Sequence, residues 1–331
     1  MEFNIVYPDI LKLKKAELHL HLDGSLRPES MLEIAAEENI PIPGKNVLAL
    51  KKQCVYEEGV KSSLTKFLKY FQFTLQFLQS ESSLSRGVYE LLEDLNKENV
   101  TVAEIRFAPH LHLMKGLTLK KVMDSVISGL EKGLNDFPMK AGFILCMLRG
   151  LKVKHAHEVV EIAEEYYGKG VIGVDLAGDE SKYPLEVYRN PLIIASQKGI
   201  NVTVHAGESG PVEEIRKAVF EINAKRIGHG IAVIKDPPLI QILKEKKIAL
   251  EICPTSNVQT NVVKSYPFHP VNHIFQKEGI VTINSDNRLI SNTSISKELS
   301  KMLHYFHWTI DDVKKVIDNA FKSSFIENAG R

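Results

Sequence analysis

The chain has 331 residues, of which 44% are hydrophobic and 25% are charged, a composition typical of a soluble globular protein with a large core. Its 42 lysine and arginine residues nearly balance its 41 aspartate and glutamate residues. This balance leaves no excess of positive charge for a nucleic-acid or anionic-membrane surface. It is compatible with a small neutral ligand, and no obligatory protein partner is indicated.

The N-terminal residues 1–13 lack the basic start, apolar run and small-residue cleavage site of a secretory signal. No stretch approaches the length needed to span a bilayer. We therefore expect a cytoplasmic protein. Cys54, Cys146 and Cys253 are widely spaced and form no C-x-x-C pair, so we expect reduced core residues rather than disulfides or a thiolate zinc site.

The first strand-like segment, residues 15–24, carries two histidines two positions apart and an aspartate two positions further on. Side chains of an extended chain alternate between faces. His19, His21 and Asp23 therefore project to one side, while the intervening leucines project to the other. If one face of this strand is a site, all three residues line it.

Seven further apolar segments suit strands: 100–109, 141–150, 170–180, 200–208, 225–233, 247–257 and 279–287. Most are continuously apolar in their middles, as expected for parallel strands that are buried on both faces. Helical patterns fill the gaps at 119–135, 155–167, 212–223, 238–245 and 270–277. Each of these is long enough to form a crossover between parallel strands.

Eight alternating units of strand and helix predict an α/β fold, namely a closed (β/α)8 TIM barrel, with a doubly wound open sheet as the alternative. No G-x-G-x-x-G motif follows a strand, which disfavours a dinucleotide-binding sheet. We expect a helical insertion after strand 1 at residues 28–97 and C-terminal helices at 296–328. Both should pack on the barrel within a single domain that spans residues 1–331.

Polar residues at the carboxyl ends of the strands are the candidate site, because barrels of this type carry their active sites there. His19, His21, His205 and Asp286 offer three imidazoles and one carboxylate, which suit a single divalent ion with zinc as the first choice. Zinc brings the pKa of a bound water to about 7. Hydrolysis of a polarised carbon centre is therefore the predicted reaction type.

Two further residues of this mouth are candidates for proton handling. Glu208 lies three residues beyond His205, and it can act as a general acid or base if burial keeps its carboxyl protonated. His229, flanked by two glycines, can reach the water or stabilise charge that develops on its oxygen.

The H-x-H pattern occurs twice more in the chain. His155 and His157 stand among charged residues at an expected helix start, which favours a solvated face over a ligand role. His110 and His112 follow the end of strand 2 but have no carboxylate beside them in the sequence. We therefore expect neither pair to bind a metal.

Six ordered blocks resemble those of adenosine deaminases of the metal-dependent amidohydrolase superfamily, and the resemblance spans essentially the whole chain. The blocks are AELHLHLDGSL at 16–26, DLAGDE at 175–180, VHAGE at 204–208, RIGHG at 226–230, CPTSN at 253–257 and NSDN at 284–287. The resemblance implies zinc-dependent hydrolytic deamination of adenosine, and of 2′-deoxyadenosine, in purine salvage. One zinc ion per chain would be held by His19, His21, His205 and Asp286.

The resemblance also implies catalytic and substrate-binding roles. Glu208 would protonate purine N1, His229 would assist the hydroxide that adds to C6, and Asp286 would also orient the water. Asp23 would contact the ribose 5′-hydroxyl and the Gly178 N–H would contact purine N3, with His21 also lying against the substrate. Adenine deaminases tend to have Glu at the position of Asp23, so this residue favours a nucleoside.

Two features of the resemblance modify the interpretation of this chain. Leu64, Phe67, Leu68 and Phe71 have helical spacing that by itself predicts a core stripe, whereas the family resemblance favours a lid over the substrate. Asn287 stands where many family members have an aspartate that contacts purine N7. N7 is a hydrogen-bond acceptor, and an amide donates to it at any ordinary pH.

The sequence is also compatible with alternative functions. The protein could deaminate free adenine or a 5′-modified adenosine. A noncatalytic barrel that binds a nucleoside or a protein partner is a further alternative, but the intact Glu208 and the complete ligand set argue against it.

Overall fold

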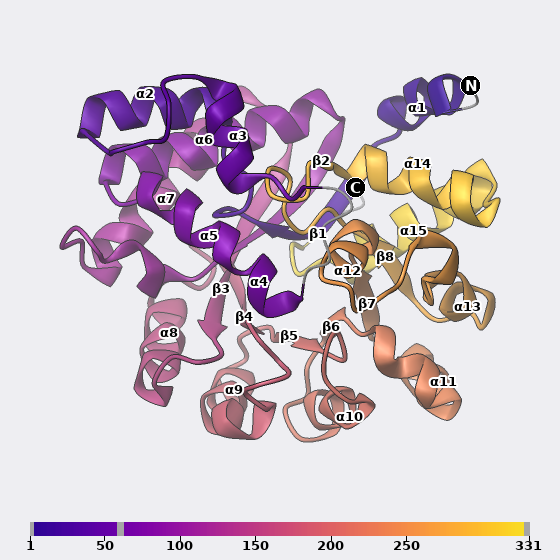
Figure 1. Ribbon diagram of the computed structural model, residues 1–331. Helices are drawn as coiled ribbons and strands as arrows, with labels where there is room; N and C mark the ends of the chain where they lie inside the picture. Colours follow the sequence, from indigo (N-terminus) through magenta and orange to yellow (C-terminus); the bar gives the residue numbers. More distant parts are fainter. Residues whose placement is uncertain (1–2, 58–62, 328–331) are drawn as a thin grey trace.

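The computed structural model describes residues 3–57 and 63–327, and eight parallel strands within these ranges form a barrel that is surrounded by helices (Figure 1). The strands are β1 (Lys15–His21), β2 (Val100–Phe107), β3 (Lys140–Leu148), β4 (Val171–Ala177), β5 (Thr203–Ala206), β6 (Arg226–His229), β7 (Ala249–Ile252) and β8 (Val281–Ile283). All eight lie inside or within one residue of the predicted segments.

The sheet closes through two short connections. Strands pair in the orders β1-β2-β3-β4 and β5-β6-β7-β8, and a bridge between Val174 and Val202 joins the two halves. On the other side, the His21 N–H donates to the Asp286 carbonyl at 2.8 Å and the Asp286 N–H donates to the His19 carbonyl at 3.0 Å. The predicted barrel is therefore confirmed.

The helices before β3 are α1 (Phe3–Lys12), α2 (Pro28–Glu38), α3 (Val47–Cys54), α4 (Leu64–Phe67), α5 (Lys69–Thr74), η1 (Leu75–Phe77), α6 (Glu81–Lys97), η2 (Pro109–His112) and α7 (Leu119–Asp136). Those after β3 are α8 (Val153–Tyr166), η3 (Leu185–Tyr188), α9 (Arg189–Gln197), α10 (Val212–Phe220), η4 (Ile231–Lys235), α11 (Pro237–Glu245), α12 (Pro254–Gln259), η5 (Tyr266–Phe268), α13 (Val271–Gln276), α14 (Ile295–Phe306) and α15 (Ile310–Ser323). The expected crossover helices are present with shifted ends.

The helices between β1 and β2 have two different positions. Helix α6 packs along α7 and against β2, so it belongs to the outer ring of the barrel. The approach of α6 to α7 is close, because a Cβ at Gly129 would lie 2.3 Å from the Ser85 carbonyl oxygen. Helices α2 to α5 are additional to the ring. Residues 58–62 of the predicted insertion lie outside the described residues.

The C-terminal helices complete the ring. Helix α15 packs against β1 and β8, where it covers the closing seam of the barrel, and α14 packs against α1. Residue 328 of the predicted tail lies outside the described residues. Within the described part of the chain, no helix has both the length and the apolar character that a membrane span requires. Cys54, Cys146 and Cys253 are buried free thiols, as expected.

His112, one of the paired histidines considered above, is a buried core residue. Its side chain is fully buried in η2, and its Nδ1 lies 2.9 Å from the Leu78 carbonyl oxygen. Burial lowers the pKa of His112 to about 4. The imidazole is therefore neutral in the folded protein at neutral pH.

This burial makes a prediction about stability and pH. The folded-state pKa of His112 is below the unfolded value of about 6.5, so acidification favours the unfolded chain, which binds the proton first. Between pH 7 and pH 5 the wild type should lose about 2 kcal/mol through this residue, and His112→Gln should lack that component. Urea unfolding at pH 7 and pH 5 measures this loss of unfolding free energy, with His157→Gln on α8 as the control. An equal loss in the wild type and His112→Gln would contradict the assignment.

Candidate active site

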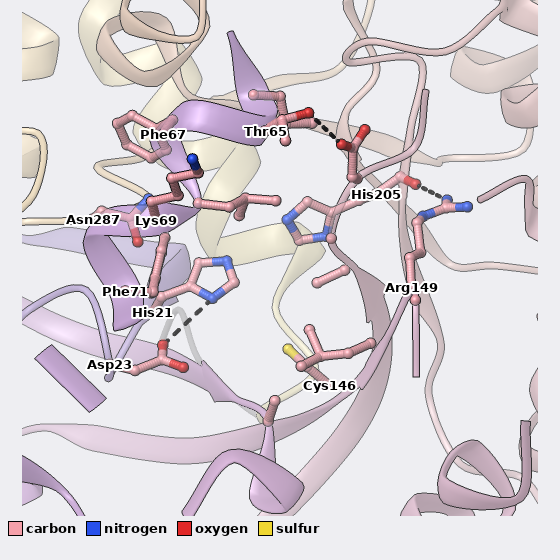
Figure 2. Close-up of a pocket in the computed structure, with 18 of the residues that line it drawn as sticks. His21, Asp23, Thr65, Phe67, Lys69, Phe71, Cys146, Arg149, His205 and Asn287 are labelled. Carbon is pink, nitrogen blue, oxygen red and sulfur yellow. Dashed lines mark hydrogen bonds and ion pairs between the residues drawn. The ribbon is translucent and has the colours of Figure 1, made fainter. Parts of the chain in front are cut away.

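A cavity of about 500 Å³ opens at the carboxyl ends of the strands (Figure 2). Its lining includes most of the predicted site residues: His21, Asp23, Leu64, Phe67, Leu68, Phe71, Gly178, His205, Glu208, His229, Asp286 and Asn287. His19 is fully buried and is not part of this lining. The fold thus brings the predicted residues together, while their roles toward a substrate stay predictions.

The histidines predicted as metal ligands converge on one point. The ligand atoms of His19, His21 and His205 lie within 4.8 Å of one another. Asp286 Oδ1 lies 3.5 Å from His19 Nε2 and 3.4 Å from His21 Nε2. His19 Nε2 is buried and has no hydrogen-bond partner among the described residues. Three imidazoles, one carboxylate and an unpartnered buried nitrogen fit a divalent metal with nitrogen and oxygen ligands.

Two buried carboxylates orient the imidazoles of this cluster. His19 Nδ1 lies 2.8 Å from Glu251 Oε2, and His205 Nδ1 lies 2.8 Å from Asp175 Oδ2. A carboxylate that accepts the Nδ1 proton leaves Nε2 as the nitrogen with a free lone pair, which is the usual arrangement behind metal-binding histidines. Glu251 therefore fixes the His19 tautomer that leaves Nε2 free for a metal, whereas Asp175 holds the His205 ring through a close ion-pair contact.

The pKa shifts of the three imidazoles in this cluster favour the binding of a metal cation. Burial lowers the pKa values of His21 and His205, so these rings are neutral ligands. Burial also acts to lower the pKa of His19, but the nearby carboxylates of Asp286 and Glu251 outweigh it and the net pKa is raised. The two carboxylates therefore favour a protonated His19, and a metal would compete with that proton for Nε2.

An arginine layer beneath the cluster neutralises the two orienting carboxylates. Arg106, fully buried on β2, lies 2.9 Å from Asp175 and 2.8 Å from Glu251. Arg226 Nε lies 2.6 Å from Glu251 Oε1. The sequence prediction missed these roles of Arg106 and Glu251. Their signal was present, because each is an ionisable residue in the middle of an apolar strand segment.

Glu208 is held at the cavity by the loop that follows β5. The Glu180 carboxylate accepts hydrogen bonds from the backbone N–H groups of Gly207, Glu208, Ser209 and Gly210 at 2.6 to 3.2 Å. Burial, followed by the charge of Asp286, raises the pKa of Glu208 well above its usual value. Burial and this charge therefore favour the protonated form of the carboxyl. A bound dication acts in the opposite direction.

His229 faces Glu208 across the site. Its Nε2 lies 3.8 Å from Glu208 Oε2, and the Asn257 Nδ2 group donates to its Nδ1 at 3.1 Å. A donor at Nδ1 selects the tautomer that carries its proton on Nε2. Burial lowers the pKa of His229 well below its usual value. The ring is therefore neutral and presents an N–H to the site.

Backbone strain accumulates at the site. His229 has φ 58° and Asp286 has φ 61°, values that are uncommon for residues with a side chain. Gly178 has φ +104°, and a Cβ there would lie 3.2 Å from Arg149 Cβ. Glycine therefore allows the backbone to take this conformation where it lines the cavity close to Arg149.

Asp23 and Asn287 border the cavity from opposite ends of the chain (Figure 2). Asp23 Oδ1 lies 3.9 Å from His21 Nδ1, and burial raises the pKa of Asp23 to about 7. A Cβ at Gly24 would lie 2.2 Å from Asn287 Oδ1. The glycine after Asp23 thus makes room for the Asn287 amide.

Helices α4 and α5 cover the cavity with apolar side chains. Leu64, Phe67, Leu68 and Phe71 line it. Thr65 Oγ1 donates to Asp179 Oδ2 at 2.7 Å (Figure 2). This hydrogen bond joins the cover to the loop after β4, a contact that the sequence did not indicate.

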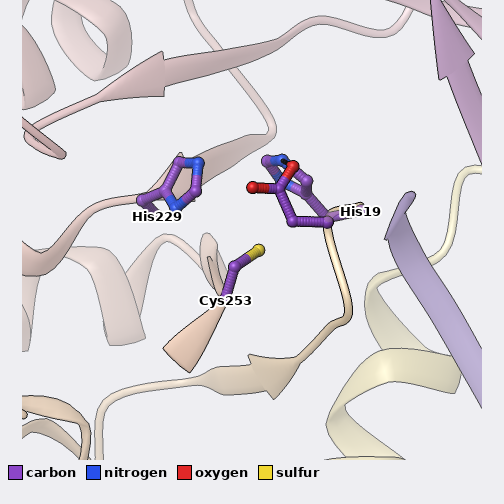
Figure 3. Close-up of side chains that lie close together, drawn as sticks. His19, His229 and Cys253 are labelled. Atoms are coloured by element: carbon purple, nitrogen blue, oxygen red, sulfur yellow. Dashed lines mark ion pairs between the residues drawn. The ribbon is translucent and has the colours of Figure 1, made fainter. Parts of the chain in front are cut away.

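Cys253 is an additional neighbour of the cluster. Its sulfur and the ligand atoms of His19, His229 and Asp286 all lie within 4.8 Å of one another, and Figure 3 shows Cys253 beside the two histidines. Its Sγ lies 3.5 Å from the Glu251 carbonyl oxygen, and burial raises the pKa of the thiol well above its usual value. A neutral thiol is a weak ligand, so the three histidines and Asp286 are the better donor set.

The orienting role of Glu251 can be tested by Glu251→Gln. The amide has the same shape but cannot accept the Nδ1 proton of His19 with full charge, so metal affinity should fall by about 10- to 100-fold. Competition with a chelator measures the affinity, with Glu161→Gln on the exposed side of α8 as the control. Circular dichroism checks that the variant is folded. An unchanged affinity in the folded variant would contradict this role.

Comparison with known proteins identifies the family. The family model for adenosine deaminase matches residues 14–331. An adenosine deaminase from Clostridium kluyveri is 43% identical over 317 residues, which cover 96% of this chain and 91% of the relative. Another from Clostridium botulinum is 40% identical over 319 residues, which cover 95% of this chain and 93% of the relative.

Solved structures agree with this assignment. An adenine deaminase from Arthrobacter aurescens has a TM-score of 0.87 at 25% identity and covers 96% of this chain and 95% of its own. Arabidopsis ADAL complexed with IMP has a TM-score of 0.84 at 25% identity, with coverage of 96% and 94%. An amidohydrolase from Burkholderia ambifaria with bound Zn shares the fold, with a TM-score of 0.87 at 23% identity and coverage of 98% and 89%. The chain belongs to the adenosine deaminase family, whose members are hydrolases that act on C–N bonds.

Proposed function

We propose that the protein hydrolyses adenosine, and 2′-deoxyadenosine, to the corresponding inosine and ammonia, with one zinc ion per chain. The observation that carries this proposal is a buried Glu208 that shares a cavity with the cluster of histidines and Asp286, where burial raises its pKa well above the usual value. Relatives at about 40% identity are named adenosine deaminases. The metabolic setting that we propose is purine salvage in the cytoplasm.

The metal would be held by His19, His21, His205 and Asp286. When bound, zinc supplies Lewis-acid activation of a water molecule at neutral pH. The choice of zinc follows from the nitrogen-rich donor set, and a relative of the same fold was solved with bound Zn. Asp286 also accepts hydrogen bonds, so it would orient the attacking water.

Glu208 would supply the proton that makes the base reactive. Transfer of its proton to N1 makes C6 more electrophilic and lowers the cost of breaking the aromaticity of the ring. The water oxygen then forms a bond to C6. The exocyclic amine receives a proton and leaves as ammonia when the C6–N bond breaks. Of the two protons of the attacking water, one is the proton that the amine receives and the other returns to the Glu208 carboxylate as the C6 carbonyl forms. N1 keeps the proton that Glu208 supplied, so that water and adenosine balance inosine and ammonia.

His229 would stabilise the attacking oxygen. Because Asn257 donates to Nδ1, the Nε2 atom carries the hydrogen that faces the site. A neutral N–H donor stabilises negative charge as it develops on oxygen. In this tautomer His229 is therefore a hydrogen-bond donor to the transition state rather than its base.

The cavity supports binding of a nucleoside. Asp23 would hydrogen-bond the ribose 5′-hydroxyl, the Gly178 N–H would contact N3 and the Asn287 amide would donate to N7. The apolar side chains of α4 and α5 would cover the substrate, which excludes bulk water and strengthens the electrostatic interactions inside. The hydrogen bond between Thr65 and Asp179 would help to hold this cover closed.

Glu208→Gln tests the proton transfer. The amide keeps the size of the side chain but cannot donate an acidic proton to N1, so turnover should fall by about 100- to 10,000-fold while zinc content is unchanged. Adenosine turnover is followed by ultraviolet absorbance, and zinc by elemental analysis. Glu213→Gln on α10 is the matched control. Loss of zinc in Glu208→Gln would mean that this residue is a ligand instead.

A substrate panel tests the nucleoside assignment. The wild type should favour adenosine and 2′-deoxyadenosine over adenine, and Asp23→Ala should lower kcat/KM for adenosine by about 10- to 100-fold. Adenine has no ribose, so Asp23→Ala should change kcat/KM for adenine little. Ammonia release measures all three reactions. Better turnover of adenine by the wild type would refute the assignment and favour an adenine deaminase.

A further inference from the structure

A second cluster of potential ligands lies beside the cavity. His110 belongs to η2, which follows β2, whereas His155 and Glu158 lie at the start of α8, which follows β3. His110 Nε2 is 2.7 Å from Glu158 Oε2, and His155 Nδ1 is 3.5 Å from the same oxygen. The two imidazole rings lie edge to face, with centroids 4.6 Å apart.

The spacing of these atoms approaches that of a metal site. The three ligand atoms lie within 4.8 Å of one another. In a tetrahedral site with metal–ligand bonds of about 2.0–2.1 Å, the ligand atoms are about 3.3 Å apart. Small side-chain rotations therefore suffice. His155 Nδ1 is buried and, beyond its 3.5 Å contact with Glu158, has no hydrogen-bond partner among the residues that the structure describes, so it is available to a metal.

The cluster is accessible to an ion from solvent. The side chain of His110 is 7% exposed, whereas those of His155 and Glu158 are 31% and 40% exposed. Water can therefore supply the remaining ligands. Lys154 lies close enough to act on His110 and Glu158 electrostatically, and its positive charge would make binding weaker than in the buried cluster.

We infer that His110, His155 and Glu158 form a second divalent-cation site, suited to zinc. Two imidazoles and one carboxylate favour zinc over magnesium or calcium, which prefer oxygen ligands. The ion would cross-link η2 to α8. Both elements adjoin the cavity, which is lined by Leu111 next to His110 and by Gly150 just before α8. An ion bound at this second site would therefore restrict the motion of η2 and α8 relative to each other at one side of the cavity.

Two residues explain why the sequence did not suggest this site. His110 has no carboxylate beside it in the chain, but the fold brings Glu158 from another unit to within hydrogen-bonding distance. His155 was grouped with His157 in the H-x-H pattern. The structure separates these two histidines, since only His155 belongs to the cluster.

Zinc stoichiometry tests the proposal on the intact metal-loaded protein. After equilibrium dialysis against Zn²⁺, the wild type should bind about two ions per chain and His155→Ala about one. His157→Ala, on the same helix, is the matched control and should bind as the wild type does. Equal zinc content in the wild type and His155→Ala would overturn the proposal.

Thermal unfolding supplies a second readout. In protein that already carries one equivalent of zinc, further Zn²⁺ should raise Tm in the wild type and in His157→Ala, because a ligand that binds the folded state stabilises it. The rise should be absent in Glu158→Gln, which keeps the side-chain size, and Mg²⁺ should have no such effect. An equal zinc-dependent rise in Glu158→Gln, or none in the wild type, would overturn the cross-link.

Discussion

The site depends on two carboxylates that are buried beneath its histidines. Glu251 accepts the Nδ1 proton of His19 at 2.8 Å, Asp175 lies in ion-pair contact with His205 Nδ1 at 2.8 Å, and Arg106 pairs with both carboxylates. A charge buried without a partner is costly, so this arrangement requires all of its members. The result is a pair of imidazoles whose Nε2 atoms are fixed at the cavity before any metal arrives.

Burial and the neighbouring charges also shift the pKa values of Asp286 and Glu208. Asp286 keeps a pKa well below its usual value despite its burial, because its close contact with His19 at 3.5 Å favours the charged form of the carboxylate. Glu208, without a cationic partner, has a pKa raised well above its usual value by burial and by Asp286. The pKa values of two carboxyl groups in one cavity thus shift in opposite directions, which suits the roles that we propose for Asp286 as ligand and Glu208 as acid.

Sequence reasoning predicted the parts of the structure that depend on local pattern. The apolar segments located the eight strands, and the polar residues at their ends located His19, His205, Glu208 and Asp286 in one mouth. What it missed depends on contacts between distant units. The pairing of Arg106 with Glu251, and of His110 with Glu158, joins residues on different strands or helices, and no spacing within one segment reveals such contacts.

The coordination of zinc tests the account most directly. X-ray absorption spectroscopy of the protein loaded with one equivalent of zinc distinguishes nitrogen and oxygen ligands, at about 2.0–2.1 Å, from sulfur at about 2.3 Å. Cys253 stands beside the cluster as a possible sulfur ligand. The account predicts a shell of nitrogen and oxygen only, from three histidines and Asp286. Sulfur in the shell would contradict it.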